Sequence, residues 1–66
     1  MKRTPFLMPL LLLALAGCAS SRAFRAGERA ERLQDYDRAV LEYQHALKQA
    51  PGNVTYQRAL GRARLR

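Results

Sequence analysis

The sequence contains one cysteine, no tryptophan and few acidic residues, with 5 Asp and Glu against 12 Lys and Arg. A single cysteine excludes an internal disulfide, and Cys18 has no second cysteine or nearby histidine with which to form a metal site. No phosphate-binding glycine loop, nucleophile elbow or paired-histidine motif is present. We therefore expect no enzymatic activity, metal, cofactor or small-molecule substrate.

The one long uncharged run, residues 6–16, is too short to cross a membrane and is interrupted by Pro9. A spanning helix needs about 20 apolar residues. Lys2 and Arg3 precede the run and small residues follow it. A basic start, a short apolar stretch and a small-residue exit are typical of a secretory signal peptide, which we favour over a transmembrane anchor.

The run ends in Leu15-Ala16-Gly17-Cys18, which resembles the lipobox of bacterial lipoproteins. The resemblance implies a diacylglyceryl thioether on Cys18, cleavage between Gly17 and Cys18, and acylation of the new amino group. Residues 1–17 would then be a signal peptide. Two or three acyl chains hold a protein firmly at a membrane, whereas one holds it only marginally. A free thiol at Cys18 is the alternative.

The residue after the cysteine, Ala19, is not Asp, which by the same resemblance favours the outer membrane over retention in the inner one. We therefore expect an exported lipoprotein, held at the periplasmic face of the outer membrane through acylated Cys18. Residues 18–22 would be the lipidated cysteine and a short tether, and Ser20 and Ser21 are candidate N-caps for the helix that follows.

No segment alternates apolar and polar residues as a half-buried strand does, so we expect an all-α fold. An apolar stripe at helical spacing covers residues 36–50, and a stripe of small residues precedes it. We expect Asp35 and Asp37 to serve the start of the second helix, and Asn53 to cap a third helix from Val54. The stripe residues are Tyr36, Ala39, Val40, Tyr43, Ala46, Leu47 and Ala50, preceded by Ala23, Ala26, Gly27 and Ala30.

Ala26-Gly27 and Leu60-Gly61 are 34 residues apart, which is the period of the tetratricopeptide repeat. The stretch QDYDRAVLEYQHALKQAPGN resembles that family, although the first helix has alanine at three positions where larger side chains are usual. The matching positions are Ala23, Ala26, Gly27, Ala30, Ala39, Tyr43, Ala46 and Pro51, then Leu60 and Gly61 in a second repeat. The resemblance implies an antiparallel helix pair over residues 23–53 and the first helix of another repeat over 54–66. A generic amphipathic hairpin is the alternative.

Repeat proteins bury their faces against neighbouring repeats, and the last helix has no C-cap signal. We therefore expect these residues to be marginally stable alone and to be the N-terminal part of a longer protein. We read His45 as solvated. Arg58, Arg62 and Arg66 would form a solvated basic face or one drawn to anionic lipid, because an exported chain meets little nucleic acid.

These observations favour a lipid-anchored protein that presents a repeat surface to envelope proteins and catalyses no reaction. An alternative is the N-terminal region of a larger secretion or type IV pilus secretin, an outer-membrane channel that resembles this arrangement of lipobox and repeats. An enzyme with a downstream catalytic domain is a third, weaker possibility.

Overall fold

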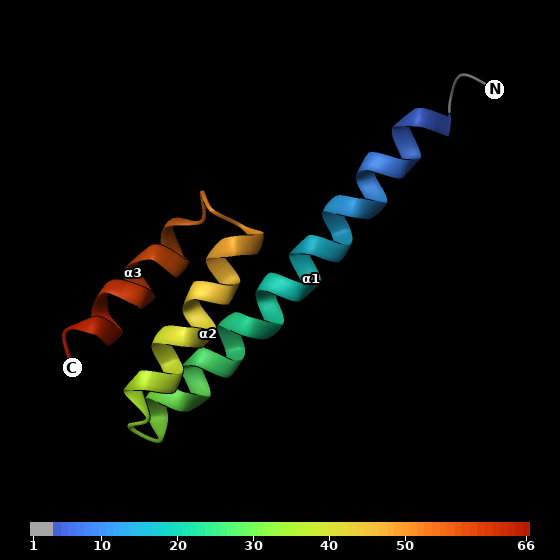
Figure 1. The fold of residues 1–66 in the computed structure, drawn as a ribbon. Helices are drawn as coiled ribbons and strands as arrows, with labels where there is room; N and C mark the ends of the chain where they lie inside the picture. Colours follow the sequence, from blue (N-terminus) through green and yellow to red (C-terminus); the bar gives the residue numbers. More distant parts are fainter. Residues whose placement is uncertain (1–3) are drawn as a thin grey trace.

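The computed structural model describes the backbone of residues 4–66 and the side chains from residue 17 onward. Within that part the chain forms α1 (Thr4–Arg32), α2 (Tyr36–Gln49) and α3 (Val54–Arg64), and no strand (Figure 1). The predicted all-α class is therefore confirmed. The side chains of the signal-peptide run and of Leu15 and Ala16 lie outside the described residues.

The turn between α1 and α2 reverses the chain in three residues. The Asp35 amide donates to the Ala30 carbonyl at 2.8 Å and the Gln34 amide to the Glu31 carbonyl at 2.9 Å. This is the Schellman pattern, which needs a left-handed residue at its centre, and Gln34 takes that place with a φ of 60°. Asp35 then caps α2, its carboxylate accepting from the Arg38 amide at 3.3 Å.

The second turn follows the expected residues. Asn53 is the N-cap of α3 and its side-chain oxygen accepts from the Tyr56 amide at 3.1 Å. The Gln57 amide side chain donates to the carbonyl of Pro51 at 2.9 Å, which ties the first turn of α3 to the loop. Both the cap at Asn53 and the helix start at Val54 confirm the sequence prediction.

Helix α2 lies between α1 and α3 and runs antiparallel to both (Figure 1). The core is small and rich in alanine, with one large, fully buried side chain, Tyr43. Phe24 of α1 joins all three helices, because its ring lies 5.4 Å from that of Tyr43 and stacks at 4.6 Å on that of Tyr56. The buried apolar residues are Ala30, Ala39, Tyr43, Ala46, Tyr56, Ala59, Leu60 and Ala63.

Helix α1 differs from the expectation near its middle. We expected residues 18–22 to be a tether, and the structure has continuous helix there. Ser20 and Ser21 are therefore interior residues, and their assignment as N-caps is wrong. Ser20 is buried, and its hydroxyl donates to the Gly17 carbonyl at 3.0 Å, so a serine is accommodated without a helix end.

Candidate functional site

The predicted repeat positions form one continuous contact between α1 and α2. Ala39, Tyr43 and Ala46 are fully buried on α2. On α1, Gly27 and Ala30 are buried, and Ala23 and Ala26 are half-buried beside them. These residues thus pack as the two sequence stripes predict.

On α3 the two predicted repeat positions differ from each other. Leu60 is buried against α2, whereas Gly61 is exposed. Pro51 is also exposed, in the loop before α3. Only Leu60 of these three therefore contributes to the core.

Gly27 and Gly61 occupy equivalent positions in the 34-residue period but have different surroundings. A Cβ atom at Gly27 would lie 2.5 Å from Cε1 and 2.6 Å from Cδ1 of the Tyr43 ring. A Cβ atom at Gly61 would meet no heavy atom within 4 Å. Glycine is therefore required at the first position, where a ring closes on the helix backbone, and no contact in the described residues requires it at the second.

A polar junction joins the three helices at the end of the core. The Tyr43 hydroxyl donates to Oε1 of Glu31 at 2.5 Å. The Arg62 guanidinium donates to both oxygens of the same carboxylate, at 2.6 Å from Nη2 and 3.0 Å from Nε. Glu31 comes from α1, Tyr43 from α2 and Arg62 from α3. One carboxylate thus holds a side chain of each of the other two helices.

The electrostatics of this junction follow from its hydrogen bonds. The Arg62 guanidinium lowers the pKa of Glu31 to about 2, against the opposing effect of burial. Burial raises the pKa of Tyr43 to about 12, and its hydrogen bond to the Glu31 carboxylate acts in the same direction. The same carboxylate raises the pKa of Arg62. At neutral pH the junction therefore holds an ionised Glu31, a neutral Tyr43 and a charged Arg62.

Sequence reasoning did not identify Glu31 as part of this junction. Glu31 follows Gly27 by four residues, one helical turn, so it lies on the face against which Tyr43 packs. A buried tyrosine hydroxyl usually finds a hydrogen-bond partner, and this face offers Glu31. That combination was the available signal. The partnership with Arg62 had none, because 31 residues separate the two.

The expected basic face of Arg58, Arg62 and Arg66 does not remain a row of free charges. Arg62 is bound to Glu31, and the Arg66 guanidinium lies 5.8 Å from the centre of the Tyr36 ring. A guanidinium at this distance from an aromatic face is within range of a cation–π contact. Two of the three side chains are thus engaged within the chain.

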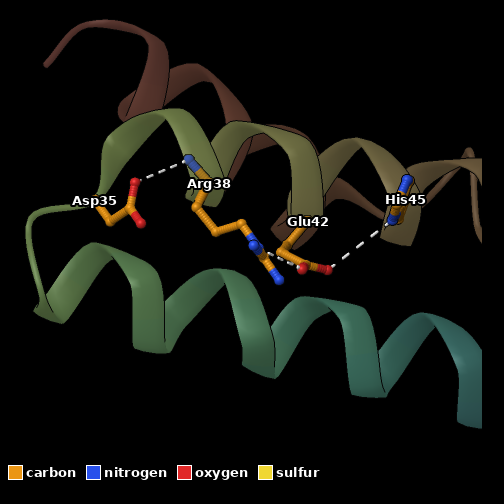
Figure 2. A network of polar contacts seen from close by, with 4 residues as sticks. All are labelled: Asp35, Arg38, Glu42 and His45. Atoms are coloured by element: carbon orange, nitrogen blue, oxygen red, sulfur yellow. Dashed lines mark hydrogen bonds and ion pairs between the residues drawn. The ribbon is translucent and has the colours of Figure 1, made fainter.

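A second polar group lies along the surface between α2 and α1 (Figure 2). Arg38 donates from Nε to Oε2 of Glu42 at 3.0 Å, and Nδ1 of His45 lies 4.0 Å from the other oxygen of Glu42. The side chains of Arg38 and His45 are well exposed. These contacts are the short-range pairs expected on a helix surface, and His45 is solvated as predicted.

Cys18 is exposed on α1. It borders an open surface depression whose lining is Gly17, Cys18, Ser21, Arg22, Arg25 and Arg29. Nothing covers the thiol among the described residues, so it is accessible to chemical modification. The depression has no carboxylate in its lining.

No group of three potential metal-ligating side chains occurs in the part of the chain that the structure describes. Within the same part, no helix has both the length and the apolar character needed to cross a membrane. The comparisons with known proteins find no match to a family model, to a curated protein or to a solved structure.

Proposed function

We propose that this chain is a lipid-anchored envelope protein that presents a tetratricopeptide-type helical surface to other proteins and catalyses no reaction. The observation that carries the proposal is the packing of the Tyr43 ring on Gly27. In a repeat of this type a small residue in the first helix lets the second helix approach closely. Gly27 and the buried Ala39 meet that requirement here.

The 34-residue register adds support from α3. Helix α3 packs on α2 through Tyr56, Ala59, Leu60 and Ala63, and it lies on the opposite side of α2 from α1 (Figure 1). Stacking helices in this order is how repeat proteins build a continuous surface. The proposed module therefore acts by binding, with its surface formed by successive helices.

The proposed anchor rests on Cys18 and the lipobox that surrounds it. The thiol is exposed, which a modifying enzyme requires. Growth of expressing bacteria with radioactive palmitate tests this half of the proposal: the wild-type chain should take up label and the Cys18→Ser variant should not. Label in the Cys18→Ser variant, or none in the wild type, would refute the anchor.

Protein binding is tested separately, with the anchor kept constant. The lipidated chain, carrying a photo-crosslinking residue at exposed Arg58 of α3, should form discrete adducts with envelope proteins on irradiation. A matched probe at exposed Leu33, in the turn, serves as the control for collision. Equal, diffuse crosslinking from both positions would count against an interaction module.

A further inference from the structure

Three arginines of α1 lie on the same helix face as Cys18. Arg22, Arg25 and Arg29 follow Cys18 at intervals of four, seven and eleven residues, and all four side chains are exposed around one surface depression. Residues at these intervals share one face of an α-helix. With a rise of 1.5 Å per residue, the row extends about 16 Å from Cys18 to Arg29. We call these three residues the arginine face.

The arginine face has no acidic partner within the chain. The five acidic residues of the sequence all lie from Glu28 onward, and the ion pairs of the described residues engage Glu31 with Arg62 and Glu42 with Arg38 and His45. No ion pair joins Arg22, Arg25 or Arg29 to an acid in that part of the chain. Their charges are therefore available to an external anionic group.

The 34-residue register shows how unusual this face is. Arg22, Arg25 and Arg29 correspond to Tyr56, Ala59 and Ala63 of α3, which are buried against α2. The face that α3 uses to dock on the preceding helix is thus replaced on α1 by three exposed cations. A helix packed there would bury three unpaired charges, at a large desolvation cost. The arginine face is accordingly a terminal surface of the stack, turned away from other helices.

We propose that the arginine face binds the anionic surface of the membrane and lays α1 along it. This inference rests on the proposed lipid attachment at Cys18, which would hold the same face against the bilayer. Guanidinium groups bind phosphate oxygens in bidentate fashion, and basic residues close to an anionic surface are attracted to it. The lipid chains would fix the position of the protein, and the arginines would fix its orientation.

The test supplies the anchor chemically, so that it does not depend on natural lipidation. The full 66-residue chain is coupled through Cys18 to a maleimide lipid in nanodiscs of phosphatidylcholine, with or without phosphatidylglycerol, that also contain a gadolinium-chelating lipid. Broadening of backbone amide resonances then reports how close each helix lies to the bilayer surface. A negative palmitate experiment would therefore refute the natural anchor without deciding this result.

We expect the amides of residues 22–29 to broaden far more than those of α3 in the discs with phosphatidylglycerol, and this difference to shrink in neutral discs. Three arginines near an anionic surface favour the surface-bound orientation by on the order of 100-fold. Because 1 M salt shortens the screening length to about 3 Å, it should remove the preference.

The matched variants remove the same charge from different faces. Arg22→Gln, Arg25→Gln and Arg29→Gln together should abolish the preferential broadening, whereas Lys48→Gln, Arg58→Gln and Arg64→Gln together should preserve it. All six side chains are exposed, so neither set disturbs the core. Equal broadening of α1 and α3 in the wild type, or an equal effect of the two triple variants, would overturn the proposal.

Discussion

The ring of Tyr43 lies directly on the backbone of Gly27, leaving no room there for a methyl group. The ring cannot easily move away, because Tyr43 is fully buried and its hydroxyl is bound to Glu31. Gly27→Ala should therefore destabilise the fold by about 1–3 kcal/mol through overpacking, less the gain of up to about 1 kcal/mol in helix propensity. Urea unfolding followed by circular dichroism measures the difference.

Gly61→Ala is the matched control for that substitution. It lies at the equivalent position 34 residues later, in α3, with open space around it. Alanine in a helix interior is favoured over glycine by about 0.5–1 kcal/mol, so this variant should be slightly more stable than the wild type. Changes of the same sign and size at both positions would contradict the contact between Gly27 and Tyr43.

Replacing Glu31 by Gln tests the acid sensitivity of the junction. The pKa of Glu31 is lowered from 4.5 to about 2 in the folded chain, so its ionised form is stabilised by folding. That contribution is fully present above pH 4.5 and is lost as the pH falls towards 2. Urea midpoints measured across this range should fall less steeply for Glu31→Gln than for the wild type. Glu28→Gln is the control and should keep the wild-type slope.

The Tyr43 hydroxyl can be removed without removing the ring. Tyr43→Phe should cost about 1 kcal/mol from the lost hydrogen bond, whereas Tyr43→Ala should cost about 3–5 kcal/mol because it empties the centre of the core. The pKa of Tyr43 is raised to about 12, so the stability that its neutral form provides is present below pH 10 and is lost as the pH approaches 12. Alkaline titration of unfolding should show this loss in the wild type and not in Tyr43→Phe.

The cap of α3 gives a prediction for local stability. Asn53→Ala removes the acceptor for the Tyr56 amide and should cost about 1 kcal/mol, whereas Asn53→Gly should cost only a few tenths. Hydrogen exchange at the first amides of α3 reports the loss directly. If Asn53→Ala protected these amides as well as the wild type, the side-chain cap would not contribute.

The sequence predicts those parts of the fold that depend on local rules. The apolar stripe around Ala39 and Tyr43 identifies α2, and Asp35 and Asn53 act as the caps that their residue types suggest. The left-handed conformation of Gln34 could not be read in the same way, because glycine or asparagine is the usual residue there. The helical course of residues 18–22 was also missed, since serine suits both caps and helix interiors with a local hydrogen bond.

The candidate site was predictable only in part, for a geometric reason. The contact of Gly27 with Tyr43 follows from two stripes on neighbouring antiparallel helices, so spacing alone suggests it. The pairing of Glu31 with Arg62 depends instead on how α1 and α3 lie on either side of α2, which no local pattern encodes. The arginine face emerged once the buried face of α3 gave its equivalent positions a meaning.

The central claim, that Cys18 is the attachment point of the chain, is tested most directly by intact mass spectrometry. The protein would be purified from membranes of an expressing bacterium with two membranes, beside its Cys18→Ser variant. We predict a chain that begins at Cys18 and carries the added mass of a diacylglyceryl group and an amide-linked acyl chain, with no lipid on the variant. A wild-type chain that retains residues 1–17 and has an unmodified thiol would contradict the claim.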